Sequence, residues 1–341
     1  VKYLADYALG RSSALAADGY FSAFISNGVP AEVCFVVFAA LTLTIIFAGV
    51  ENGIERVSKF MMPVLVVLSV IIAVYSVTRP GALEGVKFYL IPDFSRFSIN
   101  TVLGAMGQMF YSMSLAMGIM ITYGSYVKPE VNLNKAINQI EIFDTGVAFL
   151  AGAMIIPAVY VFSGTEGMGA GPSLMFISLP KVFSAMGKAG TFVGILFFVT
   201  AIFATLSSCI SVLESITANC MEIFHTSRKK TVLVLSVIYL AASAVIALGY
   251  SIFYVEVKLP NGSVGQLLDI MDYISNSVMM PFIALLSTIL IGWVVTPDYV
   301  ISEMERSGDK FRRKKLYRVM IRFVAPVMMF ILFLQSTGIL S

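Results

Sequence analysis

Long apolar runs separated by short polar stretches dominate the chain. These runs are about 18 to 25 residues long, which is enough for a helix to cross roughly 30 Å of hydrocarbon. We therefore expect an all-α transmembrane fold. The pattern predicts eight spanning helices, at residues 32–50, 60–78, 101–126, 140–162, 189–223, 231–254, 266–296 and 316–340.

The composition agrees with this pattern and restricts the chemistry. Of the 341 residues 58% are hydrophobic and 13% are charged, whereas soluble domains carry roughly 25% charged residues. Cys34, Cys209 and Cys220 lie in apolar stretches without metal-ligand spacing, and His225 is the only histidine. The chain also lacks the ATP-binding loop, the HExxH motif and the GxSxG motif. We expect no enzyme activity and no cofactor.

The basic residues divide unequally between the two predicted ends of the spans. Seven of the 23 belong to one side and Lys2 to neither. The larger set is Arg56, Lys59, Lys128, Lys135, Arg228, Lys229, Lys230, Arg306, Lys310, Arg312, Arg313, Lys314, Lys315, Arg318 and Arg322. The positive-inside rule places this set in the cytoplasm and the C-terminus outside, at a cell membrane. Topology thus explains the basic run at 312–318, and we expect no nucleic-acid partner.

Two predicted outer loops, residues 79–99 and 163–188, are unusually long. Long ordered loops usually have a function. Each is either a surface linker or a lid over an outer vestibule, and the apolar LMFISLP sequence in the second loop favours the lid.

The span at 101–126 contains a small, polar, glycine-containing stretch, GQMFYSMSLAMGIMITYGSY. Ser112, Ser114 and Gly118 are among its small residues. Small residues often allow helices to pack closely. A helix that breaks at mid-membrane would instead direct free NH groups at an anionic substrate and free carbonyls at a cation. Both interpretations remain open on the residues alone.

Carboxylates and hydroxyls within the next spans have the same ambiguity. Asp144 precedes apolar residues, so it either meets a bound cation or reaches headgroup water. The hydroxyl-rich fifth span, which also contains Glu214, predicts either back-bonding to its own helix or a cation pathway. Ser207, Ser208 and the carbonyl of Ala204 would supply three oxygens to sodium.

Four segments together resemble the neurotransmitter:sodium symporter family, in its bacterial amino-acid transporter branch. They are GQMFYSMSLAMGIMITYGSYV, DTGVAFLAGAMIIP, GPSLMFISLP and FFVTAIFATLSSCISVLES. The resemblance covers the chain and implies one transporter domain, residues 1–341, with the leucine-transporter-type inverted-repeat bundle. It makes 1–10 the tail of helix three, 32–78 helices four and five, 101–296 helices six to ten (the second inverted repeat) and 316–340 helix eleven. Residues 1–10, VKYLADYALG, have the character of a helix end facing water, and we expect further residues upstream of Val1.

The resemblance also implies roles for individual residues. Ser112 and Asp144 correspond to sodium site one, and Ala204, Ser207 and Ser208 to sodium site two. A fixed charge at Asp144 implies chloride-independent transport. The positions that correspond to the substrate pocket are Tyr111, Ser112, Ser114, Met117, Gly118, Ser208 and Val212, and Met117 favours an apolar or aromatic substrate side chain. Asp272 corresponds to the acid of the outer gate and Glu222 to that of the inner gate, although each is also a plausible surface charge.

Together these inferences predict sodium-coupled symport of a small organic solute, an amino acid, by alternating access. The expected partners are sodium, this solute and the lipid bilayer, with a homodimer left open. Two alternatives belong to other classes. One is a cation channel, which needs more polar helix faces, and the other is a non-transporting or regulatory membrane subunit.

Overall fold

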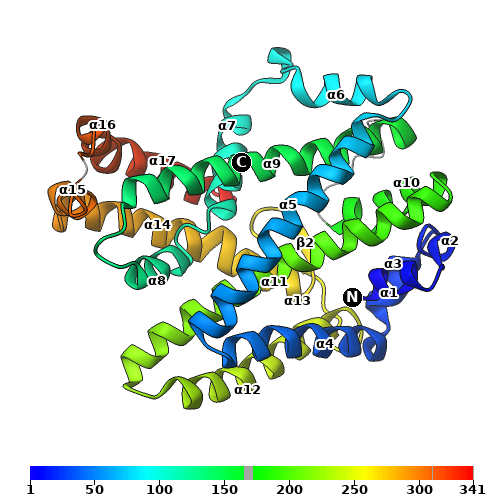
Figure 1. Cartoon of the computed structure of the whole chain (residues 1–341), viewed down its shortest axis with the longest axis horizontal. Coiled ribbons are helices and arrows are strands. Elements are labelled where there is room, and N and C mark those ends of the chain that lie inside the picture. Colours follow the sequence, from blue (N-terminus) through cyan, green and yellow to red (C-terminus); the bar gives the residue numbers. More distant parts are fainter. Residues whose placement is uncertain (165–171, 309, 341) are drawn as a thin grey trace. The chain divides into compact units, whose positions relative to one another are not determined.

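A computed structural model of the chain describes residues 1–164, 172–308 and 310–340, with Arg96 and Ser163 described without their side chains. The chain forms two compact units, which we describe separately (Figure 1). Unit 1 comprises Val1–Arg96, Thr145–Leu213 and Thr226–Ile252, and unit 2 comprises Phe97–Asp144, Glu214–His225 and Phe253–Ser341. Helices α9 (Leu133–Ser163) and α11 (Lys188–Phe224) contribute residues to both units.

Unit 1 is helical. Its other elements are α1 (Lys2–Ala8), α2 (Ser12–Leu15), α3 (Tyr20–Ser26), α4 (Gly28–Phe47), the π-helical turn Val50–Glu55, α5 (Arg56–Val77), α6 (Ala82–Leu90), the 3₁₀ turn Phe94–Arg96, the π-helical turn Leu174–Ser178, α10 (Leu179–Ala185), α12 (Arg228–Ala247) and the 3₁₀ turn Leu248–Tyr250.

Unit 2 adds one small hairpin to its helices. Its other elements are α7 (Ile99–Ser112), α8 (Ile119–Tyr126), β1 (Val257–Lys258), β2 (Val264–Gly265), α13 (Leu267–Asp272), the π-helical turn Tyr273–Met279, α14 (Met280–Ile289), the π-helical turn Leu290–Val294, α15 (Pro297–Met304), α16 (Lys314–Val319), the π-helical turn Met320–Val324 and α17 (Ala325–Ser336). The strands are antiparallel, with Val257 opposite Gly265.

Seven helices in the described part of the chain are long and apolar enough to cross a membrane. They are Gly28–Phe47, Val50–Val77, Leu133–Phe162, Lys188–Phe224, Arg228–Tyr250, Leu267–Val294 and Lys314–Ser336. Seven of the eight predicted spans are therefore confirmed as continuous helices. The span predicted at 101–126 is interrupted, because α7 and α8 are separate helices (Figure 1). Of the two interpretations left open for this stretch, the structure has the broken helix.

The core of unit 1 contains an aromatic cluster. Tyr3 and Tyr7 of α1 are 3% and 1% exposed, and their ring centroids lie 5.2 and 5.7 Å from that of Phe198 in α11. The expectation that residues 1–10 face water is wrong for this helix face, because the two tyrosines, four positions apart, bury their rings together. Asp6 beside them is 2% exposed and accepts a hydrogen bond from Lys2 Nζ at 3.0 Å.

The two long loops are folded rather than extended linkers. A Cβ atom built on Gly85 of α6 would lie 2.8 Å from Cα of Pro157, so only glycine permits α6 to approach α9 this closely. In the second loop, Leu179 and Val182 of α10 are buried in the aromatic cluster, which fits the apolar packing expected of a lid. Residues 165–171 of that loop lie outside the described residues.

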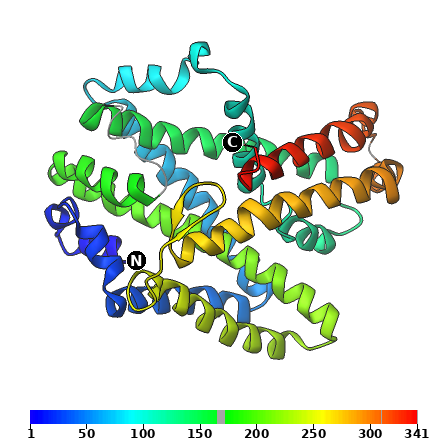
Figure 2. The ribbon, with the colours of Figure 1, turned by 180° about the vertical axis from the view of Figure 1, so that it is seen from behind.

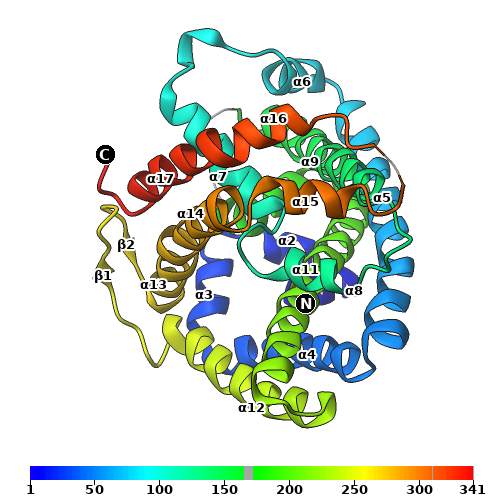
Figure 3. The same ribbon diagram turned by 90° about the vertical axis from the view of Figure 1, so that its left-hand side faces the viewer.

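Neighbouring helix pairs organise the rest of each unit. In unit 1, α4 and α12 lie side by side (Figures 1 and 2), and a second apolar cluster contains Ile46, Ile210 and Val232. In unit 2, α14 and α17 lie side by side (Figure 3).

Candidate functional site

The interruption between α7 and α8 is the most irregular backbone in unit 2. Ser98 caps the start of α7, since its hydroxyl accepts the Thr101 N–H at 3.3 Å. After Ser112 the chain leaves the helix, and Ser114, Ala116 and Gly118 have φ angles of 53°, 61° and 76°. Side chains rarely adopt this left-handed region, where a non-glycine residue costs about 1–2 kcal/mol. The break is therefore a built feature of the fold, as the resemblance implied.

Backbone hydrogen bonds close the two ends of the break. Leu115 N donates to Phe110 O at 3.0 Å, and Thr122 N donates to Gly118 O at 2.9 Å, which starts α8. The first NH groups of α8 have no acceptor within their own helix, as at any helix start. This geometry leaves donors available to an anionic group.

Ser112 and Asp144, the two residues predicted for sodium site one, are brought together in unit 2. Ser112 Oγ donates to Asp144 Oδ1 at 2.5 Å, although 32 positions separate the residues. Ser112 ends α7, and Asp144 lies on α9 with its side chain half-buried. A carboxylate and a hydroxyl at a helix end, where carbonyls lack helical partners, provide the hard oxygens that sodium requires.

A second polar cluster in unit 2 surrounds Glu214, to which the sequence analysis gave no specific role. Its side chain is 0% exposed and accepts a hydrogen bond from Tyr126 Oη at 2.8 Å. Next to it, Thr122 Oγ1 donates to Ser215 Oγ at 3.2 Å. The sequence signal that could have identified this cluster was an acid within an apolar helix, because such an acid needs a polar partner. The partner was not predictable, because Tyr126 lies 88 positions away.

The residues predicted for sodium site two all lie on α11 within unit 1. Ser207 Oγ and Ser208 Oγ both donate to Ala204 O, at 2.8 and 3.2 Å. The three oxygens are therefore close together, as the spacing predicted. In this arrangement the hydroxyls back-bond to their own helix, and a cation that took the Ala204 carbonyl would have to replace these bonds.

The remaining predicted substrate residues belong to both units. In unit 1, Ser208 and Val212 are exposed and lie four positions apart, so they share one face of α11. In unit 2, the side chain of Tyr111 is 54% exposed, and Ser114 and Met117 are half-buried in the break.

The two predicted gate acids are exposed side chains in unit 2. Asp272 ends α13 and accepts a hydrogen bond from Asn276 Nδ2 at 2.6 Å. Glu222 lies in the last turn of α11.

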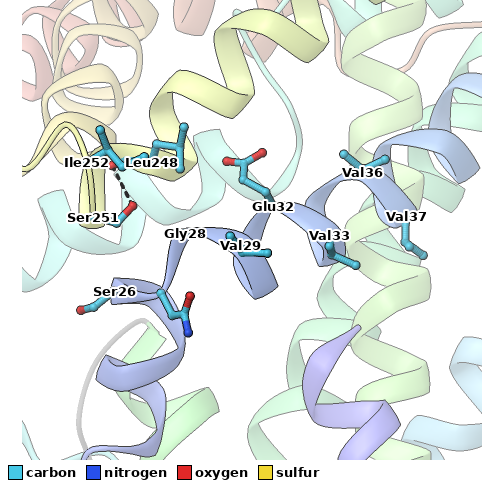
Figure 4. A pocket seen from close by; sticks show the side chains of 11 residues that line it. Ser26, Gly28, Val29, Glu32, Val33, Val36, Val37, Leu248, Ser251 and Ile252 are labelled. Atoms are coloured by element: carbon cyan, nitrogen blue, oxygen red, sulfur yellow. Dashed lines mark hydrogen bonds between the residues drawn. The ribbon is translucent and has the colours of Figure 1, made fainter.

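A large cavity in unit 1, about 740 Å³ in volume, contains none of the predicted residues (Figure 4). It lies between the start of α4 and the end of α12, and it is lined mainly by apolar side chains such as Val33 and Leu248. Glu32 is its only charged lining residue among those described, and the Oε1 atom of Glu32 has no hydrogen-bond partner there. The predicted ligands therefore do not coincide with this cavity.

Comparisons with known proteins show the family and the fold of the chain. A model of the sodium:neurotransmitter symporter family matches residues 24–340. The uncharacterized sodium-dependent transporter YhdH of Bacillus subtilis is 33% identical over 344 residues, covering 99% of this chain and 74% of that protein. An uncharacterized sodium-dependent transporter of Methanocaldococcus jannaschii is 30% identical over 308 residues, covering 87% of this chain and 59% of that protein. The crystal structure of MhsT in complex with L-phenylalanine has a TM-score of 0.83 and 34% identity, covering 98% of this chain and 75% of that chain.

Proposed function

Since this chain belongs to the sodium:neurotransmitter symporter family, we propose that it couples inward sodium movement to the uptake of an amino acid by alternating access, without chloride. Sodium-dependent transport is the activity of the family, and the chain is a multi-pass membrane protein. Its family and fold are those of a secondary transporter and not of an enzyme.

The contact between Ser112 and Asp144 carries this proposal. The Oγ–Oδ1 distance of 2.5 Å joins a hydroxyl at the end of α7 to a carboxylate on α9. A carboxylate within a membrane span is costly unless a cation or several donors compensate it. We propose that the compensating cation is sodium. Because Asp144 is itself an anion, the site needs no chloride to balance the sodium charge.

A second sodium ion is assigned to Ala204, Ser207 and Ser208. Both serine hydroxyls lie within hydrogen-bonding distance of the Ala204 carbonyl oxygen on α11. Sodium binding would replace the hydrogen bonds from the two serine hydroxyls to the Ala204 carbonyl with contacts from these oxygens to the ion. Neutral ligands suit a monovalent cation that must also be released on the other side of the membrane.

The substrate is assigned to an amino acid with an apolar or aromatic side chain. MhsT, a relative of similar fold, was crystallised with L-phenylalanine. In this chain the break supplies NH groups suited to a carboxylate, and Met117 supplies an adaptable apolar side chain. The other substrate contacts are assigned to Tyr111, Ser112, Ser114, Gly118, Ser208 and Val212.

The transport cycle also needs two gates and a defined orientation. We assign the outer gate to Asp272 and the inner gate to Glu222, because exposed carboxylates can pair with basic residues and release them. We assign residues 101–296 to the second inverted repeat, as the family resemblance implies. From the basic-residue bias we also assign the C-terminus to the outside of the membrane.

Uptake into proteoliposomes tests the proposal. We would measure accumulation of labelled phenylalanine, leucine and taurine under an inward sodium gradient, in chloride and in gluconate. Accumulation of phenylalanine or leucine in both anions supports the proposal. Sodium-independent uptake, or uptake in chloride alone, would overturn it, and downhill sodium flux without substrate would identify a channel.

A further inference from the structure

A polar cavity of about 850 Å³ lies in unit 2, apart from the residues assigned to transport. One wall is the first turns of α9, from Asn134 to Ile142, and the other is the segment that joins α15 to α16. Its charged lining residues among those described are Lys135, Lys310, Arg312 and Arg313. All four side chains are exposed, and because like charges gathered at one cavity repel one another, a bound anion would be favoured there.

Among the residues that the structure describes, acids of the α15–α16 region pair with basic residues outside the cavity lining; Asp309 lies outside the described residues. Arg306 pairs with Glu303 at 3.0 Å, Lys314 with Glu305 at 2.6 Å and Arg318 with Asp298 at 2.5 Å. These three basic residues point to their own acids. By contrast, none of the four lining cations has an acid within 4.0 Å among the residues that the structure describes. The pKa of Glu305 is lowered mainly by hydrogen bonds from Lys314 and from the Phe311 N–H, and to a smaller extent by the charge of Lys310.

The donors around the cavity suit phosphate oxygens. Arginine binds phosphate through two parallel N–H bonds, and Asn138 and Gln139 add amide NH₂ donors. The start of α9 is fixed by Asn132, whose Oδ1 accepts the Lys135 N–H at 2.9 Å. The donors on this wall are therefore held by a capped helix.

The same wall changes from polar to apolar along one face. Lys135, Asn138 and Ile142 lie at i, i+3 and i+7, and the seven-residue separation corresponds to about 10 Å along the helix axis. Ile142 is 69% exposed. Leu316, which follows the arginines in α16, is 59% exposed. A ligand with a phosphate at one end and hydrocarbon at the other matches this order of side chains.

We propose that this cavity binds the headgroup of an anionic phospholipid, with the phosphate at Lys135, Arg312 and Arg313 and an acyl chain along Ile142. The four cations belong to the side of the chain that the basic-residue bias assigns to the cytoplasm. Basic pockets beside spanning helices on that side are suited to anionic headgroups.

The first test is native mass spectrometry of the detergent-purified protein, titrated with dioleoyl phosphatidylglycerol or dioleoyl phosphatidylcholine. The variant is R312Q/R313Q. The control is K229Q/K230Q, which removes the same charge from exposed residues of α12 on the same predicted membrane side. We expect phosphatidylglycerol adducts on the unaltered protein and on the control. The dissociation constant should rise about thirtyfold in R312Q/R313Q, since each of the two basic residues near an anionic surface contributes on the order of 1 kcal/mol.

Three results would overturn the proposal. Equal weakening in both variants would mean general surface electrostatics, and equal adducts with phosphatidylcholine would mean that the headgroup charge is irrelevant. Displacement of the lipid by millimolar inorganic phosphate alone would identify a soluble-anion site. R312K/R313K, which keeps both charges, must recover at least part of the affinity. These readouts do not depend on transport, so they are separate from the test of the proposed function.

Discussion

The interrupted pair α7 and α8 and the unbroken α11 both carry predicted sodium ligands, yet they treat their polar groups differently. At the break, Ser112 reaches another helix and bonds to Asp144 at 2.5 Å. On α11, Ser207 and Ser208 bond to Ala204, one turn earlier in the same helix. A hydroxyl in a continuous helix satisfies itself locally, whereas a helix end must find partners elsewhere. The Ser112–Asp144 bond therefore holds two helices together, whereas the oxygens on α11 can exchange their local bonds for contacts to a cation.

The largest effect is expected from Asp144→Asn. The substitution keeps the size of the side chain but removes the charge that balances sodium. Uptake in chloride-free medium should fall about tenfold or more, which corresponds to about 1.4 kcal/mol of lost binding. Chloride should restore part of it. Unchanged uptake in gluconate would remove Asp144 from the ion site. Circular dichroism of the purified variant checks that the fold is retained.

Gly118→Ala tests whether the shape of the break matters. A Cβ atom there would lie 2.9 Å from Ser215 Oγ, and the φ of +76° disfavours a side chain. We expect a loss of about 1–2 kcal/mol in stability, seen as a lower melting temperature, together with slower uptake. Gly104→Ala on α7 is the matched control, because nothing lies within 4 Å of its Cβ position. An equal effect in both variants would contradict the argument.

Ser207→Ala and Ser208→Ala test the exchangeable oxygens. Each hydroxyl donates to Ala204 O on its own helix, so the stability of the fold should hardly change when either is removed. The sodium concentration for half-maximal uptake should rise about fivefold, corresponding to about 1 kcal/mol. Thr205→Ala, which removes a similar back-bond to Ala201 O, is the control. A shift as large in the control would show a general effect on the helix.

Tyr111→Phe should have the smallest effect. Tyr111 is 54% exposed, and the substitution removes only its hydroxyl. Substitutions of this kind usually stay within about 0.5 kcal/mol, so the KM for phenylalanine should change less than about twofold. A larger rise would assign a polar substrate contact to the Tyr111 hydroxyl.

Much of the fold was predictable because its main signal is local. Apolar runs identify spanning helices from composition alone, and seven of eight were confirmed as continuous helices. The eighth, at 101–126, is interrupted. Hydropathy averages over 101–126 and does not register that Ser114, Ala116 and Gly118 turn the backbone left-handed. Only the clustering of small residues indicated a break there.

The contacts of the site depended on resemblance or were not predicted at all. Ser112 and Asp144 lie 32 positions apart, and Tyr126 and Glu214 lie 88 apart. No periodicity relates residues on different helices, so pairing requires the fold. The first pair was named through the family, and the second was missed. Similarly, the burial of Tyr3 and Tyr7 followed from an aromatic partner in α11 that a ten-residue window does not contain.

The π-helical turn Tyr273–Met279 between α13 and α14 has a consequence for protein engineering and for evolution. Its i→i+5 hydrogen bonds enclose one residue more than those of an α-helical turn. Deleting one residue within it would restore a regular helix and rotate everything beyond it by about 100° about the axis. Met280 and Ala284, now buried, would leave their packing positions. Length within this turn therefore sets the rotational phase of α14, and relatives that preserve the packing of α14 must preserve the extra residue whatever its identity.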